Sequence, residues 1–526
     1  MAAPQLAGSK QIPQAYPRYQ HLTVLLPILV AYFCLAFYRL DHQSLWLDEV
    51  FSFLRADPEG TFLERQSWFA GHGPLYFRLL HLWAGWNASE FALRALSVLF
   101  GGAAVCLTYT LALRLFNRRV ACFAALLLAT SPFFIWYSQE VRYIMLMMAA
   151  ALLAMYTFHR ALTAKGTAWW VLHCCSLILA IGVFVVNIFL PVAQGLYLVW
   201  SPERRSLIRR WMACQMVVFA LFVWWANYGY ITQLGGYWQR LYVHVTTNPE
   251  TRASIRPTER LMTGTPRDFT AMGMPYTFFV FSAGYSLGPS VRELHFSRSL
   301  ATLLPHMPTI ALCGFLFGSL FVFGILALRR EPDSARLLVA WLMVPVIGTL
   351  AVSALIPAMA YNVRYVAMSF PAFILILAAG IAGFRRALLQ GGLLTAVLLV
   401  NGLSLTNYYF DPGYSREDAR AAAQYLETAA DSGDAIVVVG STAALKHYYK
   451  GELPIVALSE RVVKDRAALA TRLQELGKAH DHLWLVAIRP WWSDPKGITR
   501  TMLSEWYTPT ARQELPGVEI HAYQLR

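Results

Sequence analysis

The chain has 526 residues, of which 57% are hydrophobic and 14% are charged, and its mean hydropathy is +0.44. This composition excludes an ordinary soluble protein and predicts a polytopic membrane protein. The formal net charge of +14 does not indicate nucleic-acid binding, because the basic residues form short clusters between apolar runs, where membrane topology accounts for them.

Eleven apolar runs have about the length of a membrane-spanning helix. They lie near residues 22–40, 91–115, 120–137, 142–160, 168–184, 186–200, 211–231, 303–328, 337–357, 364–383 and 387–406. Basic clusters such as Arg118/Arg119 and Arg385/Arg386 follow alternate runs, which is typical of cytoplasmic loops. The pattern predicts a cytoplasmic tail at 1–20, a membrane domain at 21–410, and outer loops at 41–90 and 231–302.

The run from Trp169 to Trp200 has basic clusters at both of its ends. It must therefore cross the membrane twice, although each half is short for a full span at 1.5 Å per residue. We expect a tight hairpin that breaks near Asn187 and Pro191.

From Asp411 onward the composition becomes that of a soluble domain. Helical periodicity and short apolar strands alternate there, which predicts a small α/β domain with a mostly parallel sheet on the outer side of the membrane. The expected elements are a helix at 415–430, a strand at 435–439, a helix at 464–479, and strands at 483–488 and 518–525.

Two adjacent carboxylates, Asp48 and Glu49, follow the first apolar run and face outward in this topology. An ionised carboxylate near hydrocarbon is costly unless it is solvated, paired or used, so the pair is a candidate catalytic site. The alternative is that both acids merely open an interfacial helix that Ser44 caps.

Two Arg-Tyr pairs, Arg142-Tyr143 and Arg364-Tyr365, lie at other outward-facing ends of apolar runs. The guanidinium group suits bidentate binding of a phosphate, and the tyrosines add hydroxyl donors. Snorkelling of arginine to the interface is the alternative. His72, in a turn bounded by glycine and proline, is a further candidate for phosphate binding.

The second long loop contains a glycine-rich, aromatic segment, FSAGYSLGPS, at residues 281–290. Tyr285, Ser286 and the nearby Arg292 are candidates for a mobile lid or a substrate loop. An ordinary connector in the membrane interface is the alternative.

Six short motifs follow one another between about residues 20 and 410: LWLDE, GHGPLYF, FALRALS, SPFFIWYSQEVRY, FSAGYSLGPS and YNVRYVAMSFPAF. This ordered set resembles the polyprenyl-phosphate-dependent glycosyltransferases of the GT-C superfamily. Within it, the chain is most similar to bacterial relatives of the dolichyl-phosphate-mannose protein mannosyltransferases, and it also resembles the lipid A aminoarabinose transferase.

The resemblance implies transfer of one sugar, with inversion, from a polyprenyl phosphate to a lipid, glycan or protein on the periplasmic face of a bacterial inner membrane. It also implies that Asp48 is the catalytic base with Glu49 as its partner, and that Arg142 and Arg364 lie near the donor phosphate. Gly73 departs from the family's His-Pro-Pro-Leu pattern, which His72 opens. The usual Thr-His-Tyr is also absent, and residues 186–188 read Val-Asn-Ile there.

Arginine can neutralise the leaving phosphate, so we predict no obligatory cofactor and no metal site. The sequence does not decide whether a divalent metal takes part. The expected partners are the lipid bilayer, the donor and the acceptor. The rival interpretation is a polytopic transporter or flippase, whose outward charges would gate a polar or lipid-linked substrate.

Overall fold

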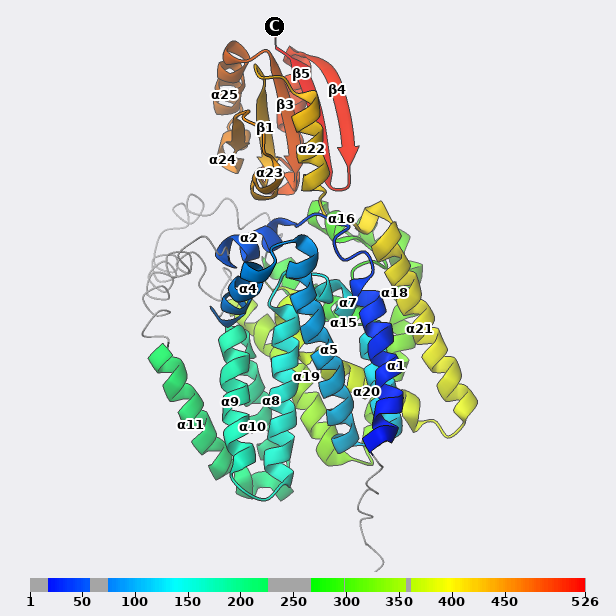
Figure 1. Cartoon of the computed structure of the whole chain (residues 1–526). Helices are drawn as coiled ribbons and strands as arrows, with labels where there is room; N and C mark the ends of the chain where they lie inside the picture. Colours follow the sequence, from blue (N-terminus) through cyan, green and yellow to red (C-terminus); the bar gives the residue numbers. More distant parts are fainter. Residues whose placement is uncertain (1–17, 57–73, 226–265, 298, 356–360, 526) are drawn as a thin grey trace, which may run out of the picture.

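The computed structural model describes residues 18–56, 74–225, 266–297, 299–355 and 361–525. Long helices form a bundle, and a sheet with its own helices lies at one end of that bundle (Figure 1). The chain is mostly helical.

Within the described residues, seven helices are long and apolar enough to cross a membrane. The pair α6 and α7, bent by 57° at a short break, supplies an eighth segment of this kind, and α1, α9 and the stretch Val185–Trp200 are shorter apolar helices. Over the described residues, each of the eleven predicted apolar runs overlaps helical structure. The helices are α1 (Arg18–Phe37), α5 (Glu90–Leu115), α6 (Arg118–Thr130), α7 (Pro132–Ser138), α8 (Ile144–Thr163), α9 (Ala168–Val183), α10 (Phe189–Trp200), α11 (Ile208–Trp225), α18 (Met307–Leu328), α19 (Pro332–Leu355), α20 (Phe370–Gly383) and α21 (Ala387–Phe410).

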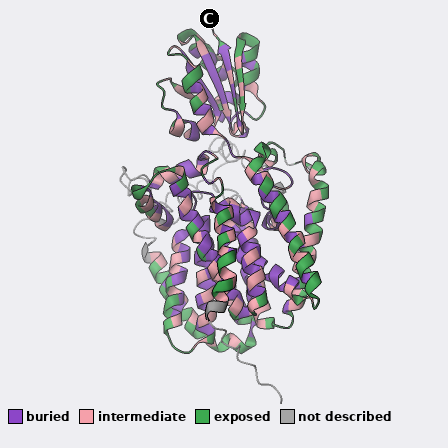
Figure 2. Ribbon diagram, turned by 45° about the vertical axis from the view of Figure 1, so that its right-hand side comes forward, coloured by how far each residue is buried: buried purple, intermediate pink, exposed green. Residues whose placement is uncertain are grey.

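Helix α20 is almost entirely buried and packs against α18, α6 and α19. Helices at the outside of the bundle present exposed side chains (Figure 2). Phe315 on α18 is 78% exposed and Leu388 on α21 is 91% exposed. Large apolar side chains exposed in this way are stable only against lipid, which fits a membrane protein.

Two glycines let α18 and α20 approach closely. A Cβ added at Gly324 would collide with the backbone oxygen of Ile376, and one at Gly380 would collide with the backbone oxygen of Leu320. Small residues at such crossings permit close backbone packing between membrane helices.

The predicted hairpin breaks where the sequence indicated. Helix α9 ends at Val183, the 3-10 turn η2 covers Val185–Ile188, and α10 then begins. Asn187 is buried and donates from Nδ2 to the Ala180 carbonyl at 2.6 Å; this carbonyl also accepts from the Phe184 backbone N–H at 3.2 Å, so the side chain adds a second bond at the end of α9. Pro191 lies in the first turn of α10, where proline is tolerated, and does not mark the break.

The predicted outer loops contain further helices. The first carries α2 (Leu47–Ala56) and α4 (Pro74–Trp86), at the end of the bundle nearest the sheet (Figure 1). In the second, α15 (Pro266–Ala283) packs against α18 and α19, so this part of residues 231–302 enters the bundle and is not a surface loop. The short α16 (Val291–Phe296) follows it.

The C-terminal region holds a five-stranded sheet of order β2-β1-β3-β5-β4. Strands β2, β1 and β3 are parallel, and β5 and β4 join antiparallel, so our expectation of a mostly parallel sheet was wrong for half of the pairings. The sequence also missed two strands: β2 is short, and β4 is polar because one face of this edge strand is exposed. The elements are α22 (Ala419–Ala429), β1 (Ala435–Gly440), α23 (Ala443–Tyr448), β2 (Ile455–Leu458), α24 (Glu460–Lys464), α25 (Arg466–Ala479), β3 (His482–Ile488), α26 (Ile498–Trp506), β4 (Thr508–Leu515) and β5 (Val518–Gln524).

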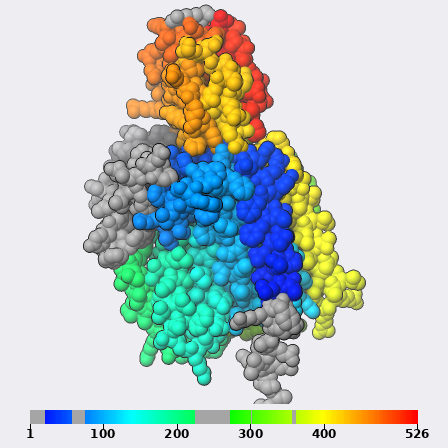
Figure 3. Space-filling model, in the orientation of Figure 1, coloured from blue at the N-terminus to red at the C-terminus, as the bar shows by residue number. Residues whose placement is uncertain are grey.

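The C-terminal region sits on the end of the bundle that carries α2 and α4 (Figure 3). Ser44 Oγ donates to the Glu417 carbonyl at 2.8 Å. Tyr448 accepts from the Leu45 backbone N–H at 2.6 Å and donates to Glu90 at 2.8 Å. These bonds fix the segment that leads into α2.

The glycine crossing gives a first prediction. Gly324→Ala should lower the melting temperature of the detergent-solubilised protein, because overpacking at a tight site costs about 1–3 kcal/mol. Gly318→Ala on the same helix is the control, since a Cβ there meets nothing within 4 Å and alanine is the better helix former. Equal melting temperatures for the two variants would contradict the proposed close approach.

Candidate functional site

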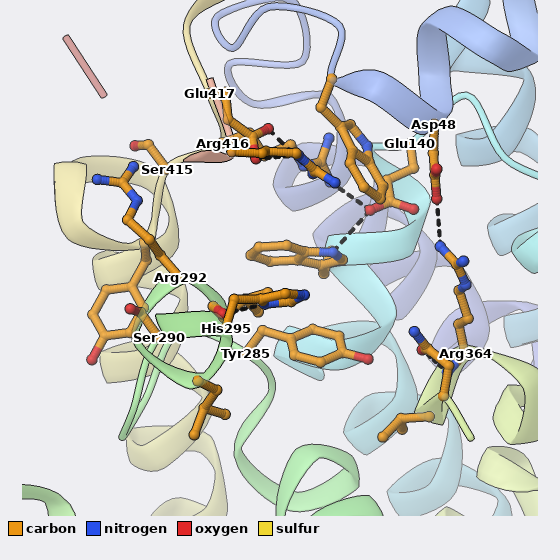
Figure 4. A pocket seen from close by; sticks show the side chains of 18 of the residues that line it. Asp48, Glu140, Tyr285, Ser290, Arg292, His295, Arg364, Ser415, Arg416 and Glu417 are labelled. Atoms are coloured by element: carbon orange, nitrogen blue, oxygen red, sulfur yellow. Dashed lines mark hydrogen bonds and ion pairs between the residues drawn. The ribbon is translucent and has the colours of Figure 1, made fainter. Parts of the chain in front are cut away.

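A cavity of about 290 Å³ lies between the bundle and the C-terminal region. Its wall includes Asp48 of α2, Glu140 from the connection after α7, and Arg364 of the 3-10 helix η6 (Val363–Ser369) that precedes α20. Arg416 and Arg489 of the C-terminal region also line it. Figure 4 shows Asp48 and Arg364 directed toward each other along one side of this space. The cavity thus gathers charged groups from segments that are far apart in the chain.

Asp48 lies between the two predicted phosphate-binding arginines. Its Oδ2 forms an ion pair with Arg364 Nη1 and lies 3.5 Å from Arg142 Nη2. Arg142 also donates to the Asp48 backbone carbonyl at 3.2 Å and to Ser52 Oγ at 3.4 Å. Arg142 and Arg364 therefore lie at the same end of the bundle as Asp48.

The arginines dominate the electrostatics of this carboxylate. Burial alone raises the pKa of Asp48, but the charges of Arg142, Arg364 and Arg489 outweigh it and hold that pKa well below its usual range. Asp48 is thus a carboxylate at neutral pH. While the arginines remain on it, it is a weak base.

Glu49 points the other way and does not line the cavity. It is completely buried, and Arg94 grips it with two hydrogen bonds of 2.9 and 2.8 Å. It also accepts from the backbone N–H of Val141 at 2.9 Å and of Trp46 at 3.3 Å, and it pairs with Arg416 at 3.4 Å. A carboxylate bonded on all sides cannot contact a substrate, so this geometry argues against a direct catalytic role.

Arg94 anchors the segment that precedes α2. It is 1% exposed and donates to the carbonyls of Leu40 at 2.9 Å, Gln43 at 2.8 Å and Ser44 at 3.2 Å. Sequence analysis missed this residue, although an arginine inside the apolar run at 91–115 was a signal, because a charge within a membrane segment needs a partner.

Arg416 brings the C-terminal region into the site. It is 8% exposed and forms an ion pair with Glu140 at 2.9 Å, in addition to its contact with Glu49. Its guanidinium lies over the rings of Trp136 at 5.1 Å and Trp46 at 5.8 Å. Nothing in the local sequence marks Arg416, because its partners are distant along the chain.

Glu140 is a second carboxylate on the cavity wall, and its environment is the opposite of that of Asp48. Its Oε1 accepts from Trp136 Nε1 at 2.9 Å and from Arg416 at 2.9 Å. Burial, with added repulsion from Glu49 and Asp48, outweighs the attraction of Arg416 and raises the pKa of Glu140 to about 7. The carboxyl group therefore changes charge near neutral pH.

The two predicted tyrosines, Tyr143 and Tyr365, both pack against the ring of Phe184. Tyr143 is fully buried and packs on Phe184 at 4.7 Å, where α9 ends. The ring of Tyr365 also packs on Phe184, with the ring centroids 5.6 Å apart, and Tyr365 lines the cavity. Arg142 and Arg364 each lie over the ring of the tyrosine that follows them, at 5.2 and 5.4 Å, so the tyrosines help to orient the arginines.

The predicted lid residues have different positions. Tyr285 and Arg292 line the cavity. Ser286 is 1% exposed, does not line the cavity, and bonds Ser404 of α21 at 3.0 Å. His72 lies outside the described residues.

The buried ion pair gives a second prediction. Arg94→Met should lower the free energy of unfolding by about 3–5 kcal/mol, because Glu49 would keep a buried charge without its main partner. Arg472→Met is the control, since its pair with Glu475 is about half exposed and such pairs contribute about 0–1 kcal/mol. Denaturant unfolding in detergent measures both, and similar losses would contradict the role of Arg94.

The position of Glu140 gives a third prediction. Its pKa rises from 4.5 to about 7 on folding, so the folded state holds a proton that the unfolded state has released across this range. The contribution of Glu140 to stability therefore falls as the pH rises from 4.5 to 7. The melting temperature should drop more between pH 5 and pH 8 in the wild type than in Glu140→Gln. Glu475→Gln should follow the wild type, and parallel curves for Glu140→Gln would contradict the raised pKa.

Comparisons with known proteins agree with this architecture. Residues 72–228 match the family model described as dolichyl-phosphate-mannose-protein mannosyltransferase. No curated protein sequence matches the chain. Among solved structures, ArnT from Cupriavidus metallidurans bound to undecaprenyl phosphate is 14% identical, with a TM-score of 0.54, and the match covers 96% of this chain and 98% of that one.

The same ArnT in its apo state gives a TM-score of 0.56 at 13% identity with the same coverage. The Archaeoglobus fulgidus oligosaccharyltransferase in its apo form gives 0.50 at 12% identity, over 96% of this chain and 74% of that chain. Identities this low establish the fold alone. The chain therefore has the GT-C fold. This fold and the family model confirm the resemblance to the polyprenyl-phosphate-dependent glycosyltransferases of the GT-C superfamily that the motifs indicated.

Proposed function

We propose that the protein is an inverting glycosyltransferase that moves one sugar from a polyprenyl-phosphate donor to a hydroxyl group of a lipid, glycan or protein acceptor. The observation that carries the proposal is the Asp48 carboxylate on the cavity wall, which pairs with Arg364 on the same wall and with the buried Arg142. A base beside two phosphate-binding cations is the equipment that such a transfer needs. The undecaprenyl phosphate bound to the similar ArnT supports a lipid-phosphate donor.

In the proposed reaction the acceptor oxygen attacks the anomeric carbon of the donor sugar. The bond from that oxygen to carbon forms while the bond from carbon to the phosphate oxygen breaks, and Asp48 takes the hydroxyl proton. Arg142 and Arg364 hold the negative charge that grows on the departing lipid phosphate. A single displacement of this kind inverts the anomeric centre.

The low pKa of Asp48 has a direct consequence for this mechanism. Both arginines contact Asp48 in the structure, whereas a bound phosphate competes for the same guanidinium groups. Binding of the donor draws positive charge away from Asp48 and raises its pKa, so the base becomes effective when the donor is present.

The remaining site residues have supporting roles in the proposal. Glu49 is a positioning residue that fixes α2 through Arg94. Tyr143 and Tyr365 orient the two arginines, and His72 is a candidate contact to the donor phosphate.

The proposed membrane arrangement follows from the charge pattern. All eleven apolar segments cross a bacterial inner membrane, with residues 1–20 in the cytoplasm and 21–410 as the catalytic membrane domain. Residues 411–526 then form a soluble α/β domain in the periplasm, above the active site. A transporter or flippase is not favoured, because the charged cavity lies at one end of the bundle and not at its midplane.

The mechanism predicts that Asp48→Asn lowers turnover without weakening donor binding. Sugar transfer should fall by about 10²–10⁴-fold, the usual contribution of a general base. Binding of undecaprenyl phosphate should be retained or tightened, because both arginines lose a competing carboxylate. Purified protein is incubated with a panel of polyprenyl-phosphate sugars and candidate acceptors, and transfer is read by mass spectrometry.

Arg364→Gln provides the complementary variant and should weaken undecaprenyl phosphate binding. Glu475→Gln, at an exposed position on α25, should leave both measurements unchanged. An Asp48→Asn enzyme with normal turnover would refute the proposed base.

Metal removal gives a further prediction. Because Arg142 and Arg364 neutralise the leaving phosphate, we propose that no metal is obligatory and that transfer continues at a similar rate in excess EDTA. Loss of activity in EDTA that Mg²⁺ or Mn²⁺ restores would contradict this part of the mechanism.

A further inference from the structure

The cavity has a second end, which the proposed donor site does not use. Figure 4 shows Asp48 and Arg364 on one side of the cavity and Arg292 and Ser415 on the other. The lining of this second end comes from α16 and from the C-terminal region, including the turn η8 (Pro490–Trp492). We call this end the outer subsite and define it by Arg292, His295, Tyr414 and Trp491.

Trp491 forms an aromatic wall of the outer subsite. It is 5% exposed, and its ring lies 5.1 Å from the ring of His295 and 5.3 Å from that of Phe296. Its indole Nε1 is buried and has no hydrogen-bond partner among the described residues. A buried indole N–H normally has a partner, so a ligand oxygen is the group that would complete this site.

Arg489 precedes the turn that carries Trp491 and has an unusual backbone conformation. Its φ of 54° lies in the left-handed region, which costs a non-glycine residue free energy and is retained mainly at functional sites. Its side chain bonds Glu417 at 2.6 Å and lies over the rings of Trp46 at 4.9 Å and Trp492 at 5.4 Å. The Arg489 guanidinium also lies 6.0 Å from the ring centroid of Trp491, so it packs against the indole rings at this end.

The charges of the lining narrow the class of ligand. Its three carboxylates, Asp48, Glu140 and Glu417, are each paired with an arginine. Arg292 has no ion pair among the described residues, so it can donate hydrogen bonds to a ligand. The outer subsite thus combines aromatic faces with hydrogen-bond donors.

A sugar ring has the matching chemistry. Its C–H groups carry partial positive charge and pack on the negative face of an aromatic ring, while its hydroxyl and ring oxygens accept hydrogen bonds. A lipid chain would need an unbroken apolar wall, which this charged and polar lining does not supply. The lining also contains no residue of the edge strands β2 and β4, so a peptide cannot bind there by adding a strand to the sheet.

We infer that the outer subsite is the acceptor subsite and that the acceptor group it holds is a sugar ring of a saccharide. The inference rests on the proposed glycosyltransferase function and narrows it from lipid, glycan or protein to carbohydrate. The C-terminal region then contributes directly to substrate recognition, through Trp491.

The test measures saccharide binding and donor binding separately on the full chain in lipid nanodiscs. The saccharide probe is an array of immobilised oligosaccharides that contain hexose, hexosamine or uronic acid, free or linked to a lipid. The donor-end probe is undecaprenyl phosphate. We expect the wild type to bind both probes, and the lipid-linked and free arms identify the source of the sugar ring.

Trp491→Ala and Arg292→Gln should each weaken saccharide binding by at least about tenfold while the Kd for undecaprenyl phosphate stays unchanged. Trp491→Phe keeps an aromatic face but lacks the indole N–H, so it should bind saccharide more weakly than the wild type and more tightly than Trp491→Ala, which separates loss of contacts from misfolding. Trp506→Ala is the matched control, because Trp506 is 38% exposed on α26 and does not line the cavity. It should bind both probes like the wild type.

Three results would overturn the inference. Wild-type protein that binds undecaprenyl phosphate but no saccharide would remove the acceptor assignment and leave the proposed function standing. Binding of unglycosylated peptides in place of saccharides, lost in Trp491→Ala, would reassign the ligand class. Wild-type protein that does not bind undecaprenyl phosphate would remove the proposed function together with the inference.

Discussion

The buried ion pair between Glu49 and Arg94 is the contact on which the rest of the site depends. Arg94 uses its other donors on the backbone that precedes α2, so the pair fixes both the start of that helix and its rotation. Asp48, one residue earlier on the same turn, is thereby turned toward the cavity and toward Arg142 and Arg364. Because an unpaired buried charge is costly, Glu49 must keep its arginine partner. The adjacent Asp48 faces the cavity, so the two acids have different roles.

Asp48 and Glu140, two of the three carboxylates on the cavity wall, show how the environment gives chemically similar groups different properties. Several arginines lower the pKa of Asp48, while burial and neighbouring acids raise that of Glu140 to about 7. Such divergence is typical of sites that handle protons. Glu140 is also the partner of Arg416, so its charge state links the cavity to the C-terminal region.

The C-terminal region is part of the site and not a separate attachment. Arg416 reaches the buried acids, Glu417 and Tyr448 hold the segment before α2, and Trp491 walls one end of the cavity. A substrate bound in the cavity would thus contact elements from both parts of the chain. The position of α15 inside the bundle adds to this enclosure, because Tyr285 follows it directly.

Much of the architecture could be predicted from the sequence, because the signals involved are local. A run of some twenty apolar residues can satisfy its backbone in lipid only as a helix, so the helical segments, the break near Asn187, and β1, β3 and β5 were all recognisable. Arg142, Arg364 and Asp48 were candidates because a charged side chain beside an apolar run is costly unless it is solvated, paired or functional. The polar edge strand β4 carried a weaker local signal, and its antiparallel pairing was missed.

Only the tertiary structure decided which groups meet. Whether Asp48 or Glu49 faces the cavity depends on the rotation of α2, which Arg94 and Arg416 fix from positions 45 and 367 residues away. The partners of Glu140 and the wall formed by Trp491 likewise arise from packing between distant segments. Hydrophobic periodicity is a local property that the sequence shows directly. The partner of a buried charge depends on tertiary packing, because burial of an unpaired charge is too costly.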